Sequence, residues 1–174
     1  MAFDQLSSAL PIKVIRLDHT AVVVRSIEDA LPLYRDLLGG TVLRVNEQPQ
    51  RDMARALLGF PGGSRIEILE PFGGDGFLND FLQARGEGVH HMTFIVQDIH
   101  AAVAQAKAAG RRVVGERFTN PSWMEAFISP RSAHGTVIQL AQASPADQAH
   151  PAETEEHIAS FLASRRRVRA SRTT

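Results

Sequence analysis

The sequence predicts an α+β fold made from two copies of one repeat, each with the order strand, helix and three further strands. Two observations favour this fold. His19 and His91, which lie 72 positions apart, each open an apolar run rich in β-branched residues, as strands do. Glu67 and Gln139 are also 72 positions apart, and each stands between apolar residues. A period this long in only two copies indicates paired modules rather than a solenoid.

The first repeat is predicted to span residues 14–71. Ser26 is a suitable N-cap for a helix that starts at Ile27 and ends at the pair Gly39-Gly40, and Pro32 predicts irregular early turns in that helix. The β-branched and apolar runs, together with a Pro-Gly-Gly-Ser hairpin turn, predict the strands 14–24, 41–45, 53–60 and 65–69.

Residues 1–13 are predicted to form a loose arm, and residues 72–88 a connector with a short amphipathic helix up to Arg85. The second repeat, residues 89–142, follows the connector and has the same order as the first. Its expected elements are the strand 89–96, the helix 99–109 and the strands 111–116, 124–129 and 136–141.

Residues 143–174 form a C-terminal extension outside the two repeats. A helix is expected at 153–167, with Ile158, Phe161 and Leu162 on one stripe. Acidic residues stand at its start and arginines at its end, as the helix dipole prefers. We expect an added surface helix with a solvated basic tail. In the alternative, the arginines bind a phosphate-bearing substrate or a partner subunit.

The composition excludes several classes of protein. Lys+Arg and Asp+Glu are both 19 in the 174 residues, so no net field favours nucleic acid or an anionic membrane. Cysteine is absent, which excludes disulfides and thiolate metal sites. No apolar run is long enough to span a bilayer, and the first residues lack the pattern of a signal peptide. We expect a cytoplasmic protein without nucleic-acid or membrane partners.

Four residues at the common offset, His19, Glu67, His91 and Gln139, are candidate metal ligands. If the repeats pack about a pseudo-twofold axis, the two histidines come together, and so do the acid and the amide. A carboxylate between two isoleucines is costly to bury unless it is paired or bound to a cation. Taken singly, each of these side chains is more commonly structural. Together, two imidazoles and two oxygen donors on rigid strands suit a divalent metal.

Several further motifs resemble those of the vicinal-oxygen-chelate superfamily, which includes glyoxalase I, extradiol dioxygenases and methylmalonyl-CoA epimerases. The similarity extends over roughly residues 15–142 and is strongest to the epimerase branch. The matching segments are residues 17–19, 34–39, 68–71, 81–82, 86–91 and 129–135.

The resemblance implies two βαβββ modules that form a cupped mixed sheet around one divalent metal ion (Co, Mn, Ni, Zn or Fe). It implies that the metal stabilises a developing enolate while a neighbouring base removes a proton beside a carbonyl. It also implies a small carbonyl or acyl-thioester substrate and a homodimer. The ligands that it implies are His19, Glu67, His91 and Gln139.

This chain departs from the epimerase pattern at two places. The epimerases usually carry Glu where Gln139 stands, and some relatives carry Gln at the position of Glu67, so that acid and amide are exchanged. Relatives also have a Glu base on the third strand, where this chain has Arg55. An arginine cannot act as a base but could hold a carboxylate or phosphate. Glu125 could point into the cup and act as the base, but a Glu that faces solvent is the commoner arrangement and the one expected here. The candidate catalytic residues are therefore Glu67, Glu125 and Arg55.

The favoured function is a metal-dependent isomerase or epimerase similar to methylmalonyl-CoA epimerase. The alternatives are a glyoxalase I-type lyase, then a non-haem Fe(II) dioxygenase, and then a metal-free binding protein for small molecules. Dioxygenases usually place their single acid where Gln139 stands, and the binding proteins have generally lost the ligand set. One scaffold can host all four functions, so the fold alone does not decide between them.

Overall fold

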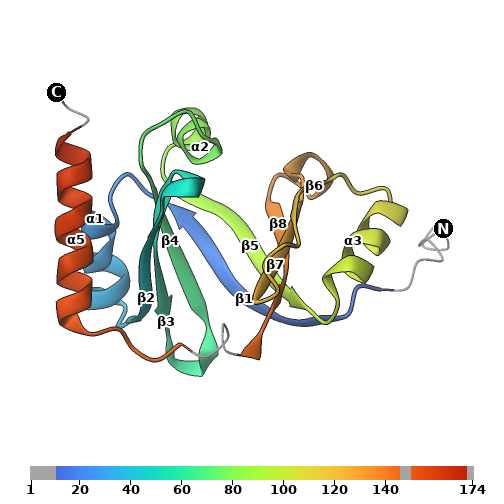
Figure 1. Ribbon diagram of the computed structural model, residues 1–174, viewed down its shortest axis with the longest axis horizontal. Coiled ribbons are helices and arrows are strands. Elements are labelled where there is room, and N and C mark those ends of the chain that lie inside the picture. The colour runs from blue at the N-terminus through green and yellow to red at the C-terminus, as the bar shows by residue number, and fades with distance from the viewer. Residues whose placement is uncertain (1–10, 146–149, 172–174) are drawn as a thin grey trace. The chain divides into compact units, whose positions relative to one another are not determined.

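The computed structural model describes residues 11–145 and 150–171, and in these residues it shows a mixed eight-stranded sheet and four α-helices (Figure 1). The strands follow the order β2-β3-β4-β1-β5-β8-β7-β6. The predicted sheet and C-terminal helix are thereby confirmed. The chain divides into two units. We call them the Glu67 unit, which is His19–His90 with His150–Thr174, and the Gln139 unit, which is Met1–Asp18 with His91–Ala149.

The Glu67 unit has the predicted order of strand, helix and three strands. β1 pairs in parallel with β4, while β4 with β3 and β3 with β2 pair antiparallel. The second strand, β2, is longer than expected because its pairing with β3 continues to Gln48. The elements are β1 (Val14–Val23), α1 (Ile27–Leu31), β2 (Thr41–Gln48), β3 (Met53–Gly59), β4 (Arg65–Pro71), α2 (Phe77–Arg85) and α5 (Glu155–Ala170).

The irregular turns expected at Pro32 are present. α1 is capped by the Ser26 side chain, which accepts a hydrogen bond from the Asp29 N–H at 3.2 Å. From Pro32 the chain continues as a wider π-helical turn, in which the Leu38 N–H donates to the Leu33 carbonyl at 3.0 Å. A proline ring crowds the preceding turn and lacks an N–H, so the regular α-helical pattern ends there.

The C-terminal helix α5 is part of the core of the Glu67 unit, and the expectation of an added surface helix is wrong. Ile158 and Phe161 are buried in the same cluster as Ile27 of α1 and Val42 and Val45 of β2. α5 lies beside α1 (Figure 1). Burial of two large apolar side chains stabilises such a contact by roughly 1.5–3 kcal/mol each.

Three arginines of α5 (Arg165, Arg166 and Arg169) form ion pairs inside this unit instead of a solvated tail. Arg165 has no exposed surface, its Nη2 lies 2.9 Å from Glu70 Oε1, and its guanidinium lies 4.3 Å from the centre of the Phe72 ring. Arg169 lies 3.2 Å from the same Glu70 oxygen and 2.8 Å from Glu28. Because the Arg165 guanidinium is fully buried among these partners, it reaches neither solvent nor an external phosphate.

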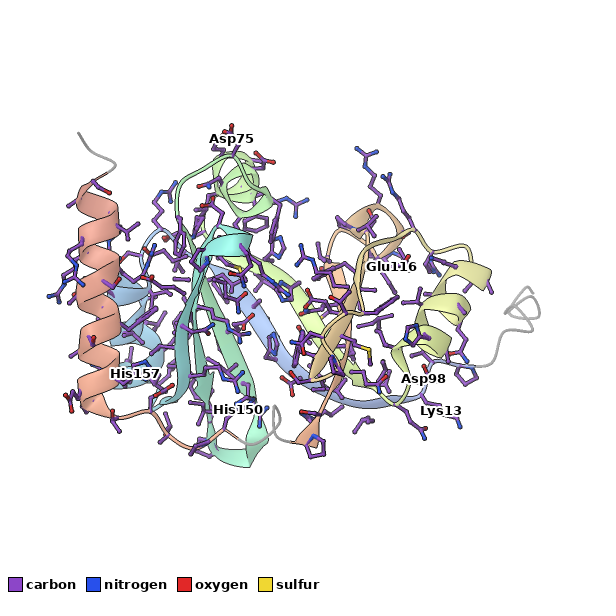
Figure 2. The ribbon with its side chains drawn as sticks, viewed as in Figure 1. Lys13, Asp75, Asp98, Glu116, His150 and His157 are labelled. Carbon is purple, nitrogen blue, oxygen red and sulfur yellow. The ribbon has the colours of Figure 1, made fainter. Side chains whose placement is uncertain are left out.

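The Gln139 unit repeats the same order. β5 pairs in parallel with β8, while β8 with β7 and β7 with β6 pair antiparallel. Asp98, labelled in Figure 2, caps helix α3 (Ile99–Ala108), because its side chain accepts a hydrogen bond from the Ala101 N–H at 3.0 Å. Within the described residues, no helix has the length and apolar character needed to cross a membrane. The elements are β5 (Gly88–Val96), α3 (Ile99–Ala108), β6 (Val113–Arg117), β7 (Trp123–Ile128) and β8 (Val137–Ala143).

Candidate metal and proton-transfer site

The Glu67 unit brings one predicted histidine and the predicted carboxylate together. β1 and β4 run parallel with Ala21 opposite Glu67, which sets His19 close to that side chain. His19 Nε2 lies 3.4 Å from Glu67 Oε2, and both residues are buried. A buried carboxylate needs a positive partner, because its charge is poorly solvated there. The strand pairing therefore sets an imidazole nitrogen beside one carboxylate oxygen, an arrangement in which both atoms can bind a cation.

Arg55 on β3 holds the other oxygen of Glu67. Its Nη1 donates to Glu67 Oε1 at 3.1 Å, and its Nε donates to Asn46 Oδ1 at 2.7 Å. Asn46 is directly opposite Arg55 in the β2–β3 pairing. The guanidinium is therefore fixed on both sides, and Glu67 is held with Oε1 toward Arg55 and Oε2 toward His19.

The Gln139 unit holds its amide in a different network. Gln139 Nε2 donates to Glu125 Oε2 at 2.7 Å, and Thr93 Oγ1 donates to Gln139 Oε1 at 2.6 Å. A carboxylate can only accept, so the Gln139 nitrogen must face Glu125. The amide oxygen then points the other way, toward Thr93, and keeps a second lone pair for a further ligand.

Glu125 is buried with no exposed surface, so the expectation that it faces solvent is wrong. Its Oε2 also accepts from Trp123 Nε1 at 2.8 Å, and Arg117 Nη1 lies 3.2 Å from its Oε1. Trp123 is therefore a hydrogen-bond donor to this carboxylate. Three donors from three different side chains fix the position of Glu125.

The two adjacent histidines of β5 have different surroundings. His91 is buried, and its ring meets the Phe127 ring edge-on, with 6.4 Å between the ring centres. The His90 ring packs against Phe81 and Phe77 of α2, at 5.1 and 5.6 Å between centres. Burial lowers the pKa of His90 to about 4, and the charge of Arg85 adds to this effect. His90 is therefore kept neutral and packed against the helix.

His19, Glu67 and His91 make up a group that could hold a metal ion: their ligating nitrogen and oxygen atoms all lie within 4.8 Å of one another. All three are buried. Two imidazoles and one carboxylate suit a divalent transition metal and leave coordination positions for water or substrate. The donor set thus fits the metal that the sequence resemblance implies. The role of Gln139 as a fourth ligand stays a prediction.

The sequence reasoning missed the residues that orient the candidate ligands. Thr93 is directly opposite Gln139 in the β5–β8 pairing, as Asn46 is opposite Arg55 in the β2–β3 pairing. Thr93 lies on a predicted strand, and Asn46 lies one residue beyond the predicted end of another. Each is the cross-strand neighbour of a candidate residue, and that pairing was the signal that could have identified them.

Comparisons with known proteins show which family the chain belongs to. Residues 18–127 match the family described as the Glyoxalase/Bleomycin resistance protein/Dioxygenase superfamily. The mitochondrial methylmalonyl-CoA epimerase of Mus musculus is 31% identical over 144 residues, which are 80% of this chain and 80% of that protein.

Solved structures of methylmalonyl-CoA epimerases share the fold of this chain. The crystal structure of methylmalonyl-CoA epimerase from Mycobacterium tuberculosis has a TM-score of 0.70 at 27% identity and covers 82% of this chain and 95% of that one. A methylmalonyl-CoA epimerase in complex with methylmalonyl-CoA and NH4+ has a TM-score of 0.68 at 25% identity, over 76% of this chain and 97% of that one. With a matching family, a shared fold and relatives that are isomerases, this chain belongs to the glyoxalase/bleomycin resistance protein/dioxygenase superfamily of enzymes.

Proposed function

We propose that the protein is a divalent-metal-dependent epimerase that acts on an acyl thioester of the methylmalonyl-CoA type. The observation that carries this proposal is the buried group of His19, Glu67 and His91 in a fold shared with methylmalonyl-CoA epimerases. One of those epimerases was solved with methylmalonyl-CoA bound, which supports an acyl-thioester substrate. A homodimer and a cytoplasmic location remain predictions from the sequence.

In this proposal the two histidines and Glu67 hold the metal, with the oxygen of Gln139 as a further ligand. When bound, the metal supplies a positive charge that stabilises negative charge developing on a substrate oxygen. Arg55 keeps Glu67 Oε2 turned toward His19 because it binds the other carboxylate oxygen. Thr93 and Glu125 fix the Gln139 amide so that its oxygen, and not its nitrogen, is presented to the metal.

Glu125 is the proposed acceptor for the proton next to the substrate carbonyl. Arg55 cannot take a proton, and Glu67 is assigned to the metal. Glu125 is a buried carboxylate whose orientation is fixed by its hydrogen bonds to Gln139 and Trp123. It is hydrogen-bonded directly to Gln139, a proposed metal ligand, so it would lie close to a substrate bound at the metal, as a general base requires.

The test is exchange of the α-proton of methylmalonyl-CoA in heavy water, followed by NMR or mass spectrometry. The metal-loaded protein should incorporate deuterium at the α-carbon, and the protein stripped with a chelator should lose this activity. Restoring the metal should restore exchange. Protein that holds its metal and shows no exchange would contradict the proposal.

A further inference from the structure

A cavity of about 280 Å³ lies in the Glu67 unit, between residues of α2 and the end of β4. It is lined by Arg25, Pro71, Asn79, Leu82 and Gln83. The volume is slightly below the range of whole small-molecule sites, so it suits one part of a larger ligand. None of these residues belongs to the proposed metal site.

The lining combines one cation and two carboxamides with the apolar residues Pro71 and Leu82. The amide nitrogen of Asn79 donates to the Gly74 carbonyl, which leaves Gln83 as the further amide donor. Arg25 is exposed and stands two positions after Val23, the buried end of β1. In the part of the chain that the structure describes, no carboxylate forms an ion pair with its guanidinium. The nearby acid, Glu87, accepts instead from the Arg25 backbone N–H at 2.7 Å, which fixes the main chain at this point. An arginine beside an amide donor such as Gln83 is the chemistry that binds phosphate.

The cavity lies at the far end of the two parallel strands that carry His19 and Glu67. Both strands run from these residues toward it, with Val23 opposite Leu69 in the pairing. Pro71 stands four positions after Glu67 on extended chain, a distance of about 13 Å at roughly 3.3 Å per residue. Leu78 of α2 is buried in one cluster with Val23 and Leu69 of these strands.

Alternation along β4 puts Glu67, Leu69 and Pro71 on one face of the sheet. The cavity and the candidate metal ligand therefore share a face. A substrate that reaches both needs a long arm between its reacting carbonyl and its anionic end. A compact acyl phosphate does not have such an arm, but a coenzyme A thioester does.

We propose that this cavity binds phosphate groups of coenzyme A when an acyl-CoA occupies the metal site, with Arg25 as the main contact. This inference rests on the proposed function, because it takes the acyl-thioester substrate from there. It adds a second recognition site, distant from the chemistry, that selects for the phosphate-bearing end of the substrate.

The test is isothermal titration of the full-length, metal-loaded protein with coenzyme A and, separately, with pantetheine, which lacks the phosphates. Arg25→Ala should weaken coenzyme A binding by about tenfold, the loss expected for a charge-assisted hydrogen bond, and should leave pantetheine binding unchanged. Arg25→Lys should retain part of the affinity. Arg112→Ala, an exposed arginine of the Gln139 unit, is the matched control and should bind like wild type.

Equal losses for coenzyme A and pantetheine in Arg25→Ala, or no loss for either, would overturn the inference. Inorganic phosphate that competes as well as coenzyme A would show a simple anion site and would overturn it too. The α-proton exchange assay is separate. If binding depends on Arg25 but exchange is absent, the phosphate site stands and the proposed reaction fails.

Discussion

The two units have the same strand pairing but carry side chains of opposite charge at equivalent positions on their third strands. Leu57 of β3 faces Glu67, and Phe127 of β7 faces Gln139. Arg55 and Glu125, each two residues earlier, therefore occupy equivalent places. In the Glu67 unit a cation donates to an acid, and in the Gln139 unit an acid accepts from an amide. The duplicated fold repeats positions without repeating charges.

A similar difference exists on the first strand of each unit. Ala21 is opposite Glu67, and Thr93 is opposite Gln139. Alanine has no side-chain donor, whereas the Thr93 hydroxyl donates to the Gln139 oxygen at 2.6 Å. The carboxylate is thus oriented by a neighbouring cation, and the amide by a hydroxyl and an acid. The carboxylate at this third-strand position lies in the Gln139 unit, which is why the proposed base, Glu125, comes from there.

The largest expected effect is on catalysis. Glu125→Gln should lower the rate of α-proton exchange by about 10²–10⁴-fold, since a positioned base contributes that much. Arg55→Gln should have a smaller effect, because Arg55 orients Glu67 and takes no proton. Glu116→Gln, an exposed acid on β6 labelled in Figure 2, should behave like wild type. A larger loss of exchange rate in Arg55→Gln than in Glu125→Gln would contradict the assignment of Glu125 as the base.

The next effect is on stability and is confined to the Glu67 unit. Arg165→Ala should lower the free energy of unfolding by about 3–5 kcal/mol, because Glu70 would remain as a buried charge with a partner removed. Urea denaturation measures the loss, and hydrogen exchange should place it in α5 and β4. Arg167→Ala, at an exposed position of the same helix, is the control. Unchanged stability in Arg165→Ala would show that the buried pair does not hold the helix.

A smaller effect is expected on metal affinity. Thr93→Val removes the hydroxyl that orients the Gln139 oxygen and gives the Gln139 unit an apolar residue, as at Ala21. Loss of a residue that orients a metal ligand typically weakens metal binding by about 10–100-fold, and we expect the lower end. Competition with a coloured chelator measures the affinity. Wild-type affinity in Thr93→Val would argue against Gln139 as a ligand.

The smallest expected effect is on how the stability of the fold depends on pH. The hydrogen bond from His157, labelled in Figure 2, lowers the pKa of Glu153 below its usual 4.5. A carboxyl group with a lowered folded-state pKa contributes stability above its usual pKa and loses it as the pH falls through the lowered value. Glu153→Gln should therefore flatten the decline in stability below about pH 4.5. An identical acid profile for the variant would contradict this prediction.

Much of this architecture could be predicted because it is periodic. The β-branched runs and the common 72-residue offset predict the strand order and select His19, Glu67 and His91. The offset fails on the third strand. It would match Arg55 with Phe127, whereas the strand pairing matches Arg55 with Glu125. The turn before β8 is longer than the turn before β4, and sequence spacing alone does not reveal such a shift.

The C-terminal helix shows a second limit of prediction from the sequence. Its apolar stripe was evident, but a stripe does not say which surface it covers. Arg165 follows Phe161 by four positions and so lies on that stripe, not on the solvated face. This was a signal that the arginine is internal. Its partner, Glu70, is 95 positions away, and only the folded chain brings the two together.

Metal content tests the central claim most directly. Protein purified without chelators should contain about one equivalent of a divalent metal per chain by mass spectrometry. His19→Ala and His91→Ala should lose it, while His100→Ala, an exposed histidine of α3, should keep it. Wild-type metal content in either of the first two variants, or a folded wild-type protein that binds no divalent metal when it is supplied, would contradict the account.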